Sequence, residues 1–198
     1  GRPQILSVAA ADYVGAMLIA QGIFLALFHR QQTGVGQSVY TSLLDSLMAM
    51  QQMEATQMML RDRDTDWVKN YLVGVVKTRD GALTLVGVFR PNPLADICRA
   101  FEIEDLSKRP EFSTLALQAQ NKASLWPLIE EAVARYTTAE ALKRLDDNDV
   151  LCSEVFDLKE ALRQPQIAHN GTIVEFEDPV HGTVRAIRSP LTLSGAPQ

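Results

Sequence analysis

The run DYVGAMLIAQGIFLALFHRQQTGVGQ, residues 12–37, carries the strongest folding signal in the chain. Between Asp12 and Arg30, apolar residues cover so much of a helical surface that this helix is expected to be buried on several sides, as part of a core. Asp12 stands where a helix N-cap is expected, and Gly34 and Gly36 stand where a helix ends. We therefore predict one long core helix near the start of the chain.

A second long helix is expected from Leu43 to Leu60, where apolar residues recur at helical spacing. Five of the six methionines fall between Met48 and Met59. Because methionine is flexible and polarizable, this helix suits either a core or a subunit interface. The alternating charges of residues 61–66 then predict a solvated linker and a domain boundary.

Strands are expected beyond this linker. Residues 71–77 and 82–89 are rich in β-branched residues and are joined by the Asp80-Gly81 turn, a hairpin signal. Residues 172–177 and 183–188 predict a second hairpin. Helices are expected over 94–101, 121–136, 139–145 and a short stretch up to residue 163. The sequence therefore predicts a mixed α/β (α+β) fold.

Helix-start signals refine these expectations. Thr138 is a candidate cap for the helix over 139–145, and Pro127 is expected in the first turn of the helix before it. Asp157 and Glu160 have the spacing of a capping box.

Composition and charge exclude several classes of protein. The 198 residues are 46% hydrophobic and 22% charged, unlike disordered, collagenous or coiled-coil chains. The net charge of −5 provides no general attraction to nucleic acid or anionic lipid, so neither is expected as a partner. The apolar stretch Met17–Phe28 is shorter than the ~20 residues of a membrane span, so no span is expected. Cys98 and Cys152 lack metal-ligand spacing, which indicates reduced thiols, no metal site and a cytoplasmic location.

One residue remains as a candidate for chemistry. No P-loop, dinucleotide, zinc-hydrolase or serine-hydrolase motif occurs, and His29, His169 and His181 are scattered in the sequence. Asp12 follows two small residues, Ala10 and Ala11, at the head of an apolar helix. Such a carboxylate acts either as an N-cap or as a nucleophile toward an activated acyl group, with nearby backbone N–H groups holding the oxyanion.

The order of several short motifs resembles class III CoA-transferases, a family that includes carnitine and bile-acid CoA-transferases and α-methylacyl-CoA racemases. The N-terminal motifs that carry the resemblance are Ala11-Asp12-Tyr13, Gly22-Ile23, Ala26-Leu27, Arg30, Thr33-Gly34-x-Gly36-Gln37 and Ser42-Leu43-Leu44-Asp45. Those further along are Thr78-x-Asp80-Gly81, Arg109-Pro110-x-Phe112, Asn121, Pro165-Gln166, Gly182-Thr183-Val184, Ser189-Pro190 and Ser194-Gly195. The resemblance thus runs from near Asp12 to the end of the chain.

The resemblance implies a fold made of long helices from a Rossmann-like large domain, followed by a smaller mixed α/β domain. It places the nucleophile-bearing and linker helices in residues 1–68, the small domain in residues 69–155, and a return segment with the C-terminal hairpin in residues 156–198. The chain would be a C-terminal half of a longer protein that forms an interlocked homodimer. The methionine-rich helix would then lie at the linker and dimer surface.

The resemblance also implies a reaction. Asp12 matches the family's nucleophilic aspartate, which attacks an acyl-CoA thioester and carries first an acyl anhydride and then CoA as a thioester. An acceptor carboxylic acid then takes the CoA. Coenzyme A is a substrate here, and no tightly bound cofactor is expected. The residues that bind the CoA phosphates would lie before Gly1, and neither acyl donor nor acceptor can be named.

Two alternatives stay open. Racemases of the family use an aspartate at this position as an acid/base group, so the chain could belong to an acyl-CoA racemase or isomerase. The chain could also be an inactive structural fragment that lacks the CoA-binding half. Some transferases carry a run of glycines before the first hairpin, where this chain has Asn70–Gly74 instead.

Overall fold

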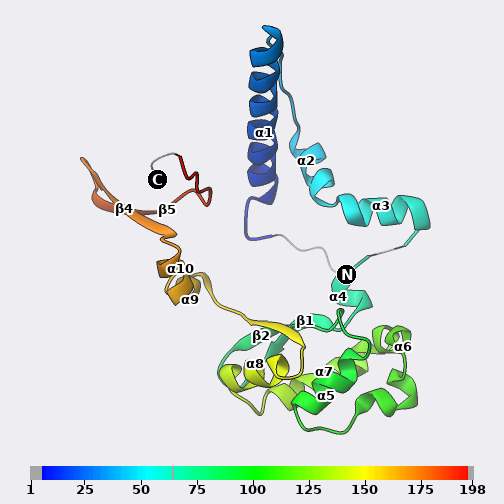
Figure 1. The fold of residues 1–198 in the computed structure, drawn as a ribbon. Coiled ribbons are helices and arrows are strands. Elements are labelled where there is room, and N and C mark those ends of the chain that lie inside the picture. The colour runs from blue at the N-terminus through cyan, green and yellow to red at the C-terminus, as the bar shows by residue number, and fades with distance from the viewer. Residues whose placement is uncertain (1–5, 64, 196–198) are drawn as a thin grey trace. The chain divides into compact units, whose positions relative to one another are not determined.

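The computed structural model describes residues 6–63 and 65–195, and the chain divides between Trp67 and Val68 into two compact units. Helices predominate, and two small antiparallel sheets accompany them (Figure 1). The predicted mixed α/β class is therefore confirmed. Because both sheets of the described residues are antiparallel, a Rossmann-like parallel sheet is not among those residues.

Unit 1 is helical and contains α1 (Ala10–Thr33), α2 (Leu43–Met50) and α3 (Gln52–Arg61). The end of α1 is as predicted, because Gly34 adopts a left-handed conformation (φ 74°) and its N–H donates to the Arg30 carbonyl at 2.8 Å. The single helix predicted from Leu43 to Leu60 is wrong. The chain breaks at Gln51 (φ −99°, ψ 23°), which ends α2 and precedes α3.

Two glycines let the chain that follows α1 pack closely against it. Gly15 and Gly22 lie two turns apart on one face of the helix. A Cβ atom on Gly15 would lie 3.0 Å from Cδ2 of Leu43, and one on Gly22 would lie 2.5 Å from Cγ1 of Val39. This face of α1 therefore has no room for larger side chains.

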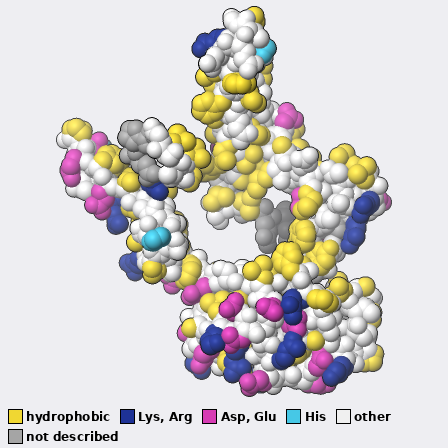
Figure 2. Space-filling model, viewed as in Figure 1, with side chains coloured by type: hydrophobic (Ala, Val, Ile, Leu, Met, Phe, Trp, Pro, Cys, Tyr) yellow, Lys and Arg dark blue, Asp and Glu magenta, His cyan; other side chains and the backbone are white. Residues whose placement is uncertain are grey.

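The rest of α1 does not have the burial that its pattern predicts. Among the described residues of the helix, Gly15 alone is buried. Figure 2 shows hydrophobic side chains along the visible face of the helix, and the exposed ones include Tyr13, Met17, Phe24, Leu25 and Phe28. The expectation of a core helix is wrong for the described residues, because its pattern demands a partner surface that they do not supply.

The methionines of α2 and α3 are exposed as well. The core interpretation is wrong for this group, and the interface interpretation stays a prediction. The exposed members are Met48, Met50, Met53, Met58 and Met59.

The length of α1 bears on the membrane question. Its 24 residues include an 18-residue window of mean hydropathy 1.7, so by length and composition alone the helix could cross a bilayer. The Met17–Phe28 stretch considered in the sequence is shorter than this apolar helix, so it gave too small a value for the apolar length. Core helices of soluble proteins meet the same criterion, so the absence of a span stays a prediction.

Unit 2 begins within a short helix, α4, and contains two sheets with several helices. Its elements are α4 (Trp67–Asn70), β1 (Val73–Lys77), β2 (Ala82–Val86), α5 (Pro93–Ala100), the 3₁₀ turns η1 (Leu106–Lys108) and η2 (Pro110–Phe112), α6 (Leu115–Gln120), α7 (Lys122–Val133), α8 (Thr138–Asp146), β3 (Leu151–Glu154), α9 (Leu158–Ala161), α10 (Pro165–His169), β4 (Ile173–Asp178) and β5 (Gly182–Ile187). Both predicted hairpins are confirmed as β1–β2 and β4–β5. The sequence did not predict β3, which adds to the far edge of β2.

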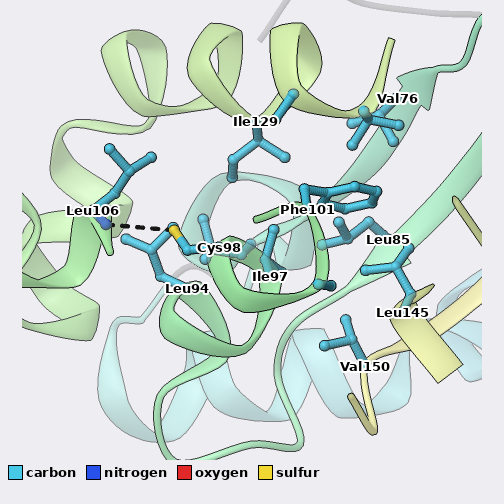
Figure 3. Close-up of a cluster of buried hydrophobic side chains, with 14 of the residues drawn as sticks. Val76, Leu85, Leu94, Ile97, Cys98, Phe101, Leu106, Ile129, Leu145 and Val150 are labelled. Atoms are coloured by element: carbon cyan, nitrogen blue, oxygen red, sulfur yellow. Dashed lines mark hydrogen bonds between the residues drawn. The ribbon is translucent and has the colours of Figure 1, made fainter. Parts of the chain in front are cut away.

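The three-stranded sheet β1–β2–β3 and the helices packed on it enclose the hydrophobic core. Alternate residues of β2, Leu83 and Leu85, are fully buried, as is Val76 of β1. Figure 3 shows side chains of α5 and α7, among them Ile97 and Ile129, in the same cluster. This part of the chain therefore has a core of its own.

Two helix starts differ from the predictions. Thr137, not Thr138, caps α8 and forms a capping box with Glu140. Pro127 lies inside α7 and not in its first turn, because α7 begins at Lys122. The capping box of Asp157 and Glu160 is confirmed.

Both cysteines are free thiols, as predicted. Burial raises the pKa of the Cys98 thiol, whose sulfur accepts a hydrogen bond from the Leu106 N–H at 3.4 Å (Figure 3). Burial also raises the pKa of Cys152. A raised pKa disfavours the nucleophilic thiolate, so neither cysteine is a candidate nucleophile.

Candidate functional site

Asp12 lies in the first turn of α1, as the third residue of the helix. Its side chain is exposed and has no hydrogen-bond or ion-pair partner among the described residues. Residues three apart are neighbours on a helix, so Asp12 lies one turn before Gly15, on the side where α2 approaches. The carboxylate is therefore open to a ligand.

The N-cap interpretation of Asp12 is wrong. Ala9 occupies the N-cap position and contributes no side-chain hydrogen bond. The helix begins two residues before Asp12, so the carboxylate lies within the helix and not ahead of it. Asp12 therefore caps no backbone N–H, and its remaining structural contribution is that of an acid in the first turn, at the positive end of the helix dipole.

Backbone donors lie beside this carboxylate. The first N–H groups of a helix have no acceptor within the helix. In α1, the Ala10 N–H donates to Val8 and the Tyr13 N–H donates to Ala9, whereas the N–H groups of Ala11 and Asp12 have no acceptor among the described residues. This end of a helix is also the positive end of its dipole, where an oxyanion is stabilised.

The motif Thr78-x-Asp80-Gly81 connects the β1–β2 turn to α8 by hydrogen bonds. Asp80 accepts hydrogen bonds from the Thr138 N–H at 2.7 Å and from the Thr138 hydroxyl at 2.9 Å. These bonds lower the pKa of Asp80. The Thr78 hydroxyl accepts a bond from the Gly81 N–H and contacts the Thr138 hydroxyl at 2.7 Å. The motif thus fastens the β1–β2 turn to the start of α8.

Other motif residues are also structural. Arg109 donates to Glu104 at 2.7 Å, which lowers the pKa of that carboxyl. Asn121 donates to the Glu111 carbonyl at 2.8 Å. Ser42 caps α2 by accepting the N–H of Asp45. Among the motif residues that we singled out, Asp12 thus stands apart as an unengaged acid.

A hollow of about 700 Å³ lies in unit 2, between α9 and the β4–β5 hairpin. Its walls are mainly apolar, with Arg163 and Arg185 among the lining residues. Glu175 pairs with Arg185 at 3.1 Å across the hairpin. This hollow contains no candidate nucleophile.

The histidines form no cluster with other potential ligands. His181 contacts Asp178 of its own hairpin turn at 2.9 Å. No group of three His, Cys, Asp or Glu side chains in residues 6–63 and 65–195 could hold a metal ion.

Comparison with known proteins places these features in a family. The sequence model of CoA-transferase family III matches residues 1–198. The chain belongs to CoA-transferase family III. The chain is 23% identical to the succinyl-CoA–D-citramalate CoA-transferase of Chloroflexus aurantiacus, over 98% of its own length and 50% of that protein's. It is also 23% identical to the succinyl-CoA:glutarate CoA-transferase of Homo sapiens, over 93% of its length and 43% of that protein's.

Solved structures show the same fold. A CAIB/BAIF family protein from Brucella suis superposes with a TM-score of 0.79 at 22% identity, covering 99% of this chain and 52% of that one. A protein from Mycobacterium tuberculosis gives a TM-score of 0.78 at 23% identity, over 98% and 52% of the two chains. The family III chain thus spans about half the length of the relatives that it matches.

Sequence reasoning missed Lys122 and Trp126 of α7. Lys122 donates to backbone carbonyls of residues 68–73, and Trp126 lies beneath its ammonium group. No sequence signal identifies Lys122, because its acceptors are main-chain atoms about fifty positions earlier.

Proposed function

We propose that this chain carries the nucleophile of a CoA-transferase, and that the nucleophile is the Asp12 carboxylate. The observation that carries the proposal is that Asp12 is exposed and unpartnered in the described part of a chain that family III matches throughout. The acids of the other motifs, Asp45 and Asp80, accept hydrogen bonds from Ser42 and Thr138, which leaves Asp12 free for chemistry. CoA-transferase activity of the relatives named above supports transfer as the reaction.

The proposed chemistry begins when a carboxylate oxygen of Asp12 attacks the carbonyl carbon of an acyl-CoA thioester. The C–S bond breaks, CoA leaves as the thiolate, and an aspartyl anhydride forms. The thiolate then attacks the aspartyl carbonyl carbon, which releases the donor acid and leaves an aspartyl-CoA thioester. The acceptor carboxylate then attacks the aspartyl-CoA thioester, which forms a second anhydride and releases the CoA thiolate. The thiolate attacks the acceptor carbonyl carbon of this anhydride, which yields the new acyl-CoA and restores the Asp12 carboxylate. Each intermediate keeps the activation of the thioester, so one difficult exchange becomes several easier ones.

The N–H groups of Ala11 and Asp12 are suited to stabilising the negative charge on the attacked carbonyl oxygen. They point out of the first turn and have no acceptor among the described residues. Donors that are fixed before the reaction lower the barrier without reorganisation. Water must be excluded in the same step, because it would hydrolyse the anhydride.

We propose that α1 is covered in the active protein by a further part of a longer polypeptide or by a partner copy, as an interlocked homodimer would provide. The exposed Phe24 and Phe28 and the methionines of α3 support this, because soluble proteins seldom expose so large an apolar surface without a partner. Acyl-CoA and a carboxylic acid are the proposed substrates, and the cytoplasm is the proposed location.

The test is substitution of Asp12 in the complete protein. Asp12→Asn is expected to lower kcat for CoA transfer at least about 1,000-fold, because the amide cannot form the covalent intermediates. Glu54→Gln is the matched control: Glu54 is also the third residue of its helix, α3, and has no hydrogen-bond or ion-pair partner among the described residues. Equal activity of Asp12→Asn and the native protein would refute the proposal.

Trapping distinguishes transfer from racemisation. Hydroxylamine added with acyl-CoA is expected to convert Asp12 to a hydroxamate, seen by peptide mass spectrometry, and to stop turnover. Exchange of the α-proton with solvent deuterium, without an adduct on Asp12, would instead establish acid/base chemistry at this residue. An unmodified Asp12 with neither activity would leave only the structural fragment.

A further inference from the structure

Lys122 is the first residue of α7, a position where its charge is unfavourable. The N-terminus of a helix is the positive end of its dipole, and a cation there is destabilising. Neither an acid in the first turn nor a side-chain cap from Asn121 offsets that charge. A lysine at this place therefore requires compensation from outside its own helix.

The compensation comes from three backbone carbonyl groups. The Lys122 ammonium donates to the carbonyl oxygen of Tyr71 at 2.9 Å, to that of Val73 at 2.8 Å, and to that of Val68. Val68 lies in the short helix α4, whose last carbonyls have no donor within the helix. One ammonium group thus satisfies all three carbonyls, and hydrogen bonds to a charged donor are about twice as strong as neutral ones.

Trp126, one turn further along α7, completes the arrangement. The Lys122 Nζ lies 4.7 Å from the centre of the Trp126 ring, within cation–π range. The edge of the same ring lies against the chain at Gly74. A Cβ atom on Gly74 would lie 2.6 Å from Cζ2 of Trp126, so only glycine fits there. Lys122 and Trp126 therefore contact this segment at four positions, Val68, Tyr71, Val73 and Gly74.

We propose that Lys122 is a positioning residue that makes residues 68–73 a rigid part of unit 2. The boundary between the units falls between Trp67 and Val68, so this segment is the first part of unit 2 along the chain. With three carbonyls tied to one ammonium, the segment keeps a fixed direction relative to the β1–β2–β3 sheet. Without the ammonium, these three carbonyls lose a donor, and the segment is held less firmly against α7.

The primary experiment measures hydrogen–deuterium exchange of the 198-residue chain by mass spectrometry. Lys122→Met is expected to speed amide exchange in residues 68–74 about tenfold or more, while exchange in β2 and α8 stays as in the native chain. Lys143→Met is the matched control, because Lys143 is an exposed lysine that pairs with Asp147 of its own helical region. That variant is expected to leave residues 68–74 unchanged.

Chemical rescue separates hydrogen bonding from charge alone. Lys122→Ala leaves a space bounded by the three carbonyls and the Trp126 ring. Propylammonium, which has N–H donors, is expected to slow the exchange of residues 68–74 again. Tetramethylammonium at the same ionic strength offers charge without donors and is expected to have no effect.

Two results would overturn the inference: unchanged exchange in residues 68–74 of Lys122→Met, or an equal rise throughout unit 2, which would show only a general loss of stability. The outcome for the proposed function is separate. If Lys122→Met loosens the segment but the complete native protein transfers no CoA, the proposed function fails and the positioning role stands. If transfer occurs and the segment does not loosen, the positioning role fails alone.

Discussion

Helix α1 and the sheet-and-helix core of unit 2 use similar apolar side chains in opposite ways. Phe24 in α1 is 71% exposed, whereas Leu83 in β2 is 0% exposed. Burying one such side chain is worth about 1.5–3 kcal/mol. The core of unit 2 gains this free energy from contacts within the chain. The exposed side chains of α1 would gain it only by packing against another surface. Hydrophobic periodicity therefore reports that a surface needs cover, and it does not report which chain provides the cover.

The largest expected difference comes from removing the same atoms in both regions. Leu85→Ala is expected to lower the free energy of unfolding of unit 2 by about 2–5 kcal/mol, because it leaves a cavity in a closed core. Leu25→Ala, on the exposed part of α1, is expected to change the stability of the 198-residue chain by less than about 0.5 kcal/mol. Urea unfolding followed by circular dichroism and by tryptophan fluorescence would measure both.

An equal loss for Leu25→Ala would contradict the contrast and would mean that α1 is already covered in solution. Sedimentation of the native chain would then identify a second copy as the cover. In the complete protein, where we propose that α1 is covered, Leu25→Ala is expected to be costly as well. Comparing Leu25→Ala with Leu85→Ala therefore tests whether α1 is covered by another surface.

Much of the fold could be predicted from the sequence because its signals are local. The hairpin β1–β2 has Asp80-Gly81 between two β-rich runs, and α1 has a continuous apolar pattern. The break at Gln51 has no glycine or proline to mark it. The strand β3 is four residues long, and its partner β2 lies more than sixty residues earlier. Features that depend on distant partners could not be predicted.

The candidate site divides in the same way. Asp12 was found because it begins an apolar helix, but its N-cap role was wrong because the helix starts at Ala10. Lys122 was not found, because the structure alone brings its ammonium to the carbonyls of Tyr71 and Val73. A residue type and its local spacing identify a reactive group, whereas a positioning group is defined by contacts that span the fold.

The starts of α8 and α1 provide a smaller contrast. The Thr137 hydroxyl accepts the Glu140 N–H and the Glu140 carboxylate accepts the Thr137 N–H, whereas α1 has Ala9 with no side-chain bond. Thr137→Ala is expected to lower the stability of unit 2 by about 1 kcal/mol, and Thr137→Ser is expected to retain most of it. Urea midpoints of the three proteins would measure the difference. Equal midpoints for Thr137→Ala and the native chain would show that the capping box does not stabilise α8.

Asp80 and Asp12 complete the comparison, as one carboxylate fixed by hydrogen bonds and one left free. The bonds from Thr138 hold the pKa of Asp80 below its usual 3.8 in the folded chain. The unfolded chain therefore binds a proton at a higher pH than the folded one. The stabilisation by Asp80 is complete above the unfolded pKa and declines as the pH falls through 3.8 toward the folded pKa.

Asp80→Asn cannot titrate, so the difference in melting temperature between the native chain and this variant is expected to narrow from pH 6 to about pH 3. A difference that stays constant over this range would mean that the bonds to Thr138 do not depend on the charge of Asp80.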